Sequence, residues 1–347
     1  WTIRVDGKEY KYDVSDGDTL YTVTRALSDA IRNDASRPDG YSYTTWLEAT
    51  NRIAIYKEDI IFEVDYQDGF VNADPGVGGE MDIRGIIMGT AGRIQGDSDD
   101  DVFDITADPW HGVVGPISLH GFGGSDLYKI NLRGTGSAMF NVYDRSPAGD
   151  MGADRLLIYG TPEDDFFLFR PGSISAVEVD ENREPVPGGA IERVNYDGDI
   201  NAGIFVFGRD GDDTFVFDGT SSPLTVYGDA GNDLFQVGQM FKSPRDGSNP
   251  DNGLGPEDWF SPTLTTRGYL SDGVNHATTL YGGTGDDTFN VCRNMAELYL
   301  YGEEDNDTFR IRAFVKVDPN DPKAPFTNIN GGQGENFISY TVNAPVR

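Results

Sequence analysis

An alternation of apolar and polar residues, followed by a glycine and a short acidic loop, recurs along most of the chain. In the clearest copy, residues 281–291 (YGGTGDDTFNV), Tyr281 precedes the loop, Asp287 closes it and Phe289 follows. The first glycine of each copy falls at Gly96, Gly121, Gly160, Gly208, Gly228, Gly282, Gly302 and Gly331. Eight copies in register identify an internal repeat, which takes precedence over any residue-level interpretation.

The positions after each glycine are equally regular. Five residues on stands an acidic or amide side chain: Asp101, Asp126, Asp165, Asp213, Asp233, Asp287, Asp307 and Asn336. Two residues further stands a large apolar one: Phe103, Tyr128, Phe167, Phe215, Phe235, Phe289, Phe309 and Ile338. An apolar residue also lies two before each glycine, as in a strand with one buried face. Each copy therefore predicts a strand, a tight glycine turn and a second strand.

The spacing of the copies predicts how they stack. Successive glycines are 25, 39, 48, 20, 54, 20 and 29 residues apart. Twenty residues accommodate two short strands and two turns, which is one coil of a β-solenoid. We expect the gaps of 39 and 48 to contain degenerate coils. The gap of 54 requires an insertion, placed at about 238–278, which is rich in Pro, Gly and Asn; we expect an irregular loop that contacts a partner or covers the coil.

The first part of the chain lacks the repeat. Residues 1–68 predict a small α+β module of ββαββ order, with a hairpin around Asp6 and Gly7 and a helix over 20–31. Residues 12–23 also resemble the start of a LysM glycan-binding module, which is kept as an alternative. Residues 69–92 are expected to be a linker with an entry strand near 81–88.

The fold class that follows is mainly β: a parallel β-roll or β-solenoid of degenerate repeats over residues 93–347, preceded by the small α+β module. The 58 acidic and 27 basic residues give a formal charge of −31, which argues against nucleic acid or an anionic membrane as a partner. No apolar run approaches membrane-spanning length. The single Cys292 cannot form an internal disulfide, so another stabilising device is expected.

Catalytic groupings are not evident. None of the three histidines, His111, His120 and His276, is near a second histidine at ligand spacing, and neither H-E-x-x-H nor G-x-S-x-G is present. Acidic doublets such as Asp286 and Asp287 recur down the chain. Because catalysis needs one such pair and metal coordination can use many, we expect a metal-binding protein that is not an enzyme.

The repeat resembles the hemolysin-type calcium-binding (RTX) repeats of secreted bacterial proteins, whose pattern is G-G-x-G-x-D-x-U-x. Residues 282–290 (GGTGDDTFN) fit every fixed position, and residues 208–216 and 228–236 miss only the second glycine. The copies at Gly160 and Gly302 lack the fourth-position glycine. The resemblance implies a parallel β-roll with calcium between stacked loops and export to a calcium-rich exterior.

Stacking also gives the predicted calcium ligands. A 20-residue coil places loop 208–213 under loop 228–233, and loop 282–287 under loop 302–307, so that carbonyl and carboxylate oxygens from two loops can surround one ion. Asp213 with Asp233 and Asp287 with Asp307 are the preferred pairs. The full predicted metal set is Gly208, Asp210, Gly211, Asp213, Gly228, Ala230, Gly231, Asp233, Gly282, Thr284, Gly285, Asp287, Gly302, Glu304, Asp307, Asp101, Asp126 and Asp165.

Together these features predict a calcium-stabilised structural or adhesive segment of a large extracellular bacterial protein at the cell surface, such as an adhesin, a surface-layer component or a filament component. The chain is interpreted as a piece of a longer protein. Two alternatives stay open: the calcium-binding tail of a secreted hydrolase, and a carbohydrate-binding module. The partners left open are other copies of the chain, neighbouring domains, and cell-surface glycans or proteins; no membrane insertion is expected.

Overall fold

The computed structural model describes residues 151–180, 184–249, 255–312 and 325–341 without a break. Before residue 151 it describes residues 2–5, 8–12, 26, 27, 30, 42–44, 52–56, 60, 61, 70–73, 81–87, 92–96, 98–107, 116–134, 137–145, 148 and 149. In these residues the protein is mainly β, with parallel sheets, as the alternation of apolar and polar positions predicts. The chain divides into two compact units, each described by itself.

The first unit comprises Trp1–Ile158 and Ala190–Ala202. Its hairpin consists of β1 (Thr2–Val5) and β2 (Lys8–Lys11). In spatial order, one sheet contains β3 (Ser42–Thr44), β4 (Arg52–Tyr56), β6 (Phe70–Ala73), β8 (Gly92–Gln95), β10 (Pro116–His120), β12 (Met139–Val142) and β16 (Ile191–Tyr196). The other contains β5 (Ile60–Ile61), β7 (Met81–Ile87), β9 (Asp101–Ala107), β11 (Leu127–Asn131) and the first four residues of β13 (Arg155–Tyr159).

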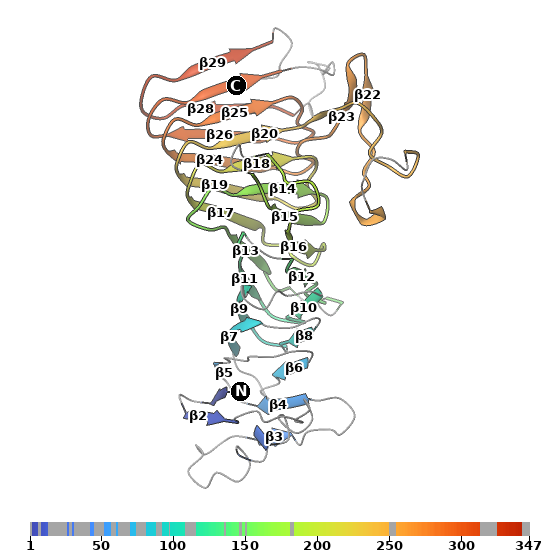
Figure 1. Cartoon of the computed structure of the whole chain (residues 1–347), viewed down its shortest axis with the longest axis vertical. Helices are drawn as coiled ribbons and strands as arrows, with labels where there is room; N and C mark the ends of the chain where they lie inside the picture. The colour runs from blue at the N-terminus through green and yellow to red at the C-terminus, as the bar shows by residue number, and fades with distance from the viewer. Residues whose placement is uncertain are drawn as a thin grey trace. The chain divides into compact units, whose positions relative to one another are not determined.

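The second unit comprises Tyr159–Gly189 and Gly203–Arg347 (Figure 1). One of its sheets contains β15 (Ser173–Val177), β14 (Phe166–Arg170), β18 (Thr214–Phe217), β20 (Leu234–Val237), β25 (Thr288–Val291), β27 (Thr308–Ile311) and β29 (Phe337–Tyr340). The other contains β17 (Ile204–Asp210), β19 (Leu224–Ala230), β24 (Thr278–Thr284), β26 (Leu298–Glu303) and β28 (Thr327–Asn330). Neighbours pair in parallel, except for the antiparallel hairpin of β14 and β15.

The strand register follows the repeat. Val206 pairs with Val226 and Leu280 with Leu300, so the 20-residue spacing becomes one step across a parallel sheet. The apolar residues after each loop form a buried column of stacked rings, with centroids 4.7–5.4 Å apart: Phe167, Phe215, Phe235, Phe289 and Phe309. Stacking at the strand spacing buries whole rings and aligns every copy on its neighbours. The 39-residue gap contains β12, which pairs in parallel with β10 and β16, as expected for a degenerate copy.

The insertion is more regular than its composition predicts. A small antiparallel sheet forms here from β21 (Met240–Phe241), β23 (Gly268–Leu270) and β22 (Thr263–Thr265), in that spatial order. The short helix η2 (Pro256–Asp258) lies between β21 and β22 in the chain. The expectation of an irregular loop is therefore wrong for this part. Proline and glycine here mark the turns between short strands rather than an unstructured segment. Its partner contact stays a prediction.

The N-terminal expectations are met in part. The sequence pattern predicts the strands after the helix at 41–45, 52–56 and 60–65. They correspond to β3, β4 and β5, and the entry strand near 81–88 is β7. The α+β module itself is not seen, since most of the helix expected over 20–31 lies outside the described residues, as does the LysM-like stretch apart from Tyr12. β4 and β5 pair in parallel with β6 and β7, and the boundary at residue 68 stays a prediction.

Candidate metal centre

The aspartates that close the loops turn inward. Their exposed fractions do not exceed 7%, although the residues before them in the chain face solvent. They are Asp101, Asp126, Asp165, Asp213, Asp233, Asp287 and Asp307. Burying a row of carboxylates is costly unless hydrogen bonds, protons or cations compensate each one, so the environment of these residues decides what the repeat does.

In the second unit each of these aspartates except Asp165 accepts a backbone hydrogen bond from the preceding copy; Asp165 accepts one from Thr161 in its own loop. The N–H of Asp213 donates to Oδ1 of Asp233 at 2.7 Å, Asp233 to Asp287 at 2.8 Å, and Asp287 to Asp307 at 3.0 Å. The series starts where Asp165 donates to Asp213 at 2.7 Å and ends where Asp307 donates to Oδ1 of Asn336 at 2.7 Å. We call this series the inner ladder. It uses one oxygen of each carboxylate.

The glycine five residues earlier makes room for the other oxygen. A Cβ at Gly228 or Gly282 would collide with Oδ2 of the aspartate in its own loop, and would also lie within 2.8 Å of the glycine carbonyl of the next copy. Only a glycine lets the carboxylate pack directly on the backbone. The G-x₄-D spacing of the sequence is therefore a packing requirement as well as a candidate ligand pattern.

The second carboxylate oxygens are left without a hydrogen bond. Oδ2 of Asp213, Asp233, Asp287 and Asp307 is buried and has no partner among the described residues. Burial raises the pKa of Asp213 to about 9, of Asp287 to about 8, of Asp233 to about 7 and of Asp307 to about 6. A buried oxygen of this kind needs a proton or a cation, so these residues fit the calcium that the resemblance implies.

A second set of side chains bonds in the opposite direction. Oδ1 of Asp212 accepts the N–H of Asn232 at 2.7 Å, and Oδ1 of Asp286 accepts the N–H of Asn306 at 3.0 Å. These exposed residues precede the inner aspartates and form an outer ladder. Together the two ladders explain the acidic doublets: one member reaches towards the next copy and the other towards the copy before it.

The remaining predicted ligands lie where the register expects them. Asp210, Ala230 and Thr284 are aligned at the ends of β17, β19 and β24, and Gly211, Gly231 and Gly285 follow with positive φ. The N–H of Glu304 donates to the carbonyl of Gly283 in the loop below. The structure thus brings together loops 208–213 and 228–233, and loops 282–287 and 302–307. It also pairs loop 228–233 with loop 282–287, across the insertion.

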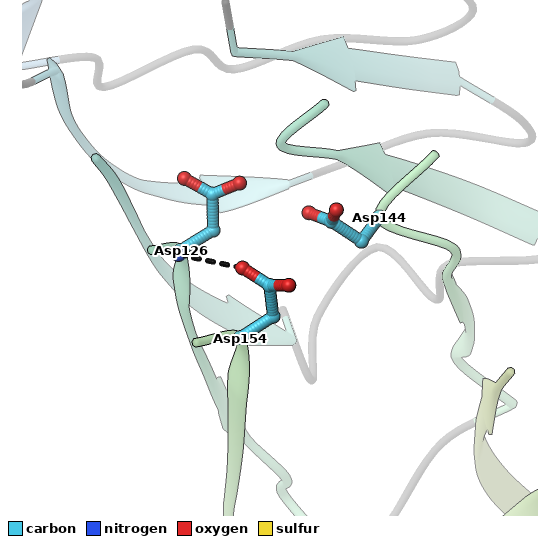
Figure 2. Close-up of side chains that lie close together, drawn as sticks. All are labelled: Asp126, Asp144 and Asp154. Carbon is cyan, nitrogen blue, oxygen red and sulfur yellow. Dashed lines mark hydrogen bonds between the residues drawn. The ribbon is translucent and has the colours of Figure 1, made fainter. Parts of the chain in front are cut away.

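In the first unit three buried carboxylates converge. Asp126, Asp144 and Asp154 are each no more than 1% exposed, and each offers an oxygen within 4.8 Å of the others (Figure 2). Oδ1 of Asp154 accepts the N–H of Asp126 at 2.9 Å, and Oδ1 of Asp126 accepts the N–H of Asp101 at 2.7 Å. We call these three residues the aspartate cluster. Asp126 and Asp154 also belong to a series of the same kind as the inner ladder of the second unit, which starts at Asp101.

The surroundings of the cluster hold its carboxylates in place. The Tyr128 hydroxyl donates to Oδ1 of Asp144 at 2.5 Å and accepts the N–H of Gly121 at 2.6 Å. Oδ2 of Asp126 is buried without a hydrogen-bond partner. Burial, followed by the adjacent Asp144 carboxyl, raises the pKa of Asp126 to about 10. Three mutually close carboxylates cannot all be ionised without a cation between them. Oxygen ligands of this kind suit calcium.

Sequence analysis identified Asp126 and missed its two partners. Leu119 pairs with Val142, which places Asp144 opposite Gly121, so in this degenerate copy an aspartate replaces the repeat glycine. Asp154 takes the inner position, and its N–H donates to Oδ1 of Asn201 at 3.2 Å. The available sequence signal was the apolar residue two positions before Asp144, which is Val142. It was hidden because ten residues, not five, separate Asp144 from Asp154.

Comparisons with known proteins give no match: no family model, no curated protein and no solved structure matches this chain. In the part of the chain that the structure describes, no helix has the length and apolar character needed to cross a membrane. The chemistry of the site therefore follows from its own residues and their geometry.

Proposed function

We propose that the chain is a calcium-stabilised structural or adhesive segment of a large extracellular bacterial protein, and that its repeats form a parallel β-roll. The observation that carries the proposal is the buried aspartate cluster of Asp126, Asp144 and Asp154. A protein that needed only packing at the position of Asp144 could place a glycine there, as the other copies do. A third carboxylate is useful where a divalent cation neutralises it.

The register supports the roll. Parallel partners 20 residues apart in two sheets are what consecutive coils of a roll produce, and both sheets show this spacing between residues 204 and 237. In such a roll the paired loops 208–213 with 228–233 and 282–287 with 302–307 are the proposed additional calcium sites. Asp213, Asp233, Asp287 and Asp307 supply the buried oxygens, and loop carbonyls supply the rest.

The proposed extracellular location follows from the calcium affinity expected of such a module. Extracellular calcium modules bind at about 10⁻⁴–10⁻³ M, a range in which calcium saturates them outside a bacterial cell but not inside. Binding would then be coupled to folding, because the repelling carboxylates cannot come together without the ion. We propose that the protein is exported, becomes rigid on the cell surface, and has no catalytic site in this segment.

Calcium titration with a matched pair of variants tests the proposal. In isothermal titration calorimetry of the chelator-treated protein, Asp144→Asn should remove one binding event and leave the others. Asp104→Asn, a partly exposed change on the same unit, should leave the stoichiometry unchanged. Thermal melting should give a melting temperature many degrees lower in EDTA than in 2 mM calcium, as expected from ligand linkage. Identical melting curves, with no heat of calcium binding, would reject the proposal.

A further inference from the structure

A cleft of about 530 Å³ lies on the second unit, beside the outward-facing residues of β19, β24 and β26. Its volume falls in the range of small-molecule sites. Tyr227, Tyr281 and Tyr301 line it together with Asp229 and Glu303, and none of the described lining residues is a lysine, arginine or histidine. None of the inner-ladder aspartates lines this cleft, but Thr284 and Glu304, two of the predicted metal ligands, do, so the cleft adjoins the proposed calcium loops.

The tyrosines form a regular apolar wall with polar tips. The Tyr227 and Tyr281 ring centroids are 4.9 Å apart, and those of Tyr281 and Tyr301 are 4.8 Å apart, with interplanar angles of 5° and 15°. Within the stack both faces of Tyr281 are covered. Tyr301 pairs with Asn330 on β28, so among the described strands no further ring continues the stack on that side. The cleft therefore offers ring edges and phenol hydroxyls, and Asn330 is the in-register neighbour beyond Tyr301.

Carboxylates and amides line the cleft beside the tyrosines, with Asp229 and Glu303 two residues after Tyr227 and Tyr301 on β19 and β26. Asp229 pairs with Gly283, and Gly283 pairs with Glu303, so the glycine separates two acidic side chains across neighbouring strands. Gly283 has a φ of 112°, which disfavours any larger residue there and keeps the space between the carboxylates open. Asn330 and Gln333 add amides that both donate and accept hydrogen bonds.

We propose that this cleft binds an uncharged oligosaccharide. Sugar hydroxyls both donate and accept hydrogen bonds, and the cleft presents acceptors on Asp229 and Glu303 together with phenol hydroxyls and amides that also donate. The edges of the tyrosine rings can contact the C–H groups of the sugar rings. The even spacing along three strands suits a linear chain of sugar units lying along the cleft.

The charge of the cleft selects the ligand. Among the described lining residues there are three acids, Asp229, Glu303 and Glu304, and no base, although Arg209 beside the cleft partly compensates Asp229. Asp229 and Glu303 lie on either side of Gly283 on neighbouring strands, so their carboxylates repel each other and any anion placed between them. An anionic polymer such as a polyuronate would meet the same repulsion. This inference goes beyond the proposed metal-stabilised role and does not require it.

Calorimetry with defined hexamers tests this proposal. The full chain in 2 mM calcium is titrated with cellohexaose, with chitohexaose, and with hexagalacturonate as the anionic counterpart of equal length. At least one neutral hexamer should bind, and hexagalacturonate should bind at least about tenfold more weakly. Tyr301→Ala should weaken the neutral hexamer about tenfold. Glu303→Gln should weaken it about fivefold and reduce the discrimination against hexagalacturonate.

The control is Tyr299→Ala, a tyrosine on the same strand face that does not line the cleft; it should bind as the parent does. Tyr301→Phe keeps the ring and removes only the hydroxyl, so it gives an answer if Tyr301→Ala fails to fold. Binding of neither neutral hexamer, equal affinity for hexagalacturonate, or no effect of any Tyr301 or Glu303 change would overturn the proposal. Calcium melting of the same samples reports the metal-stabilised role separately.

Discussion

A single residue type, aspartate, has three different positions in this repeat. The outer aspartates, such as Asp286, are exposed; the inner ones, such as Asp287, are buried against a glycine; and Asp144 replaces that glycine. Both inner ladders end in asparagine, at Asn201 and Asn336. The amide of Asn336 donates to the carbonyls of Gly331 and Gln333, which a carboxylate cannot do. The ladder therefore ends on a neutral side chain that satisfies its own polar atoms.

The glycine five residues before each inner aspartate should not tolerate a larger residue. Gly228→Ala places a methyl group where Asp233 Oδ2 and the Gly282 carbonyl lie. Because backbone and a ladder carboxylate must both move, we expect the free energy of unfolding to fall by about 1–3 kcal/mol. Gly198→Ala, where a Cβ would meet nothing within 4 Å, is the control. Chemical denaturation of the two variants gives the comparison, and equal stabilities would contradict the packing argument.

The effect of an inner aspartate on the melting temperature should depend on calcium: destabilising without the ion and stabilising with it. Asp287→Asn keeps the Oδ1 acceptor and removes a buried charge, so in EDTA at pH 8 it should raise the melting temperature. In calcium the same change removes a proposed ligand and should lower it. Asp286→Asn, in the exposed neighbour, should do neither. If Asp287→Asn shifts melting in the same direction under both conditions, its carboxylate is not a ligand.

At the scale of strands, the 20-residue copies were predictable because glycine, aspartate and phenylalanine recur at fixed positions. Their stacking follows from geometry, since identical positions must align in a parallel sheet. Other elements were not predictable. The antiparallel hairpin of β14 and β15 and the small sheet inside the insertion are closed by local turns, at 171–172 and 266–267, which fall outside the repeat pattern. Asp144 was missed because its loop is longer than the others.

The inner ladder should make the metal-free protein less stable as the pH rises. The folded carboxyls of Asp213, Asp233, Asp287 and Asp307 titrate between about 6 and about 9, above their ordinary value of 3.8. The folded state therefore holds more protons, and its stability is greatest below about pH 4 and declines through the folded pKa values.

Melting in EDTA from pH 5 to pH 9 measures this decline. A net loss of about 2 kcal/mol would lower the melting temperature by about 4–8 °C. Calcium should reverse the decline above pH 7, because it replaces the protons as the counter-charge. A melting temperature in EDTA that rises over this range would show that the ladder carboxylates are ionised and stabilised by other groups.

For the whole molecule the net charge of −31 sets the response to ions. A chain so acidic repels itself, and general screening by salt relieves part of that repulsion at any position. Bound calcium acts only where oxygens converge. We therefore expect 2 mM calcium to reduce the radius of gyration, measured by small-angle scattering in chelator-treated protein, more than magnesium or sodium chloride at equal ionic strength does. Equal effects of the three salts would assign the compaction to screening alone.

The fixed step between Val206 and Val226, repeated between Leu280 and Leu300, gives the protein a mechanical property. In the proposed roll each coil contacts only the coils beside it, so tension applied at one end detaches coils one by one rather than rupturing the fold at once. A 20-residue coil pulled straight spans about 70 Å. Optical-tweezer traces should show contour-length increments near that value, at forces that drop when calcium is removed. Such a segment would yield under shear and wind up again when the load is released.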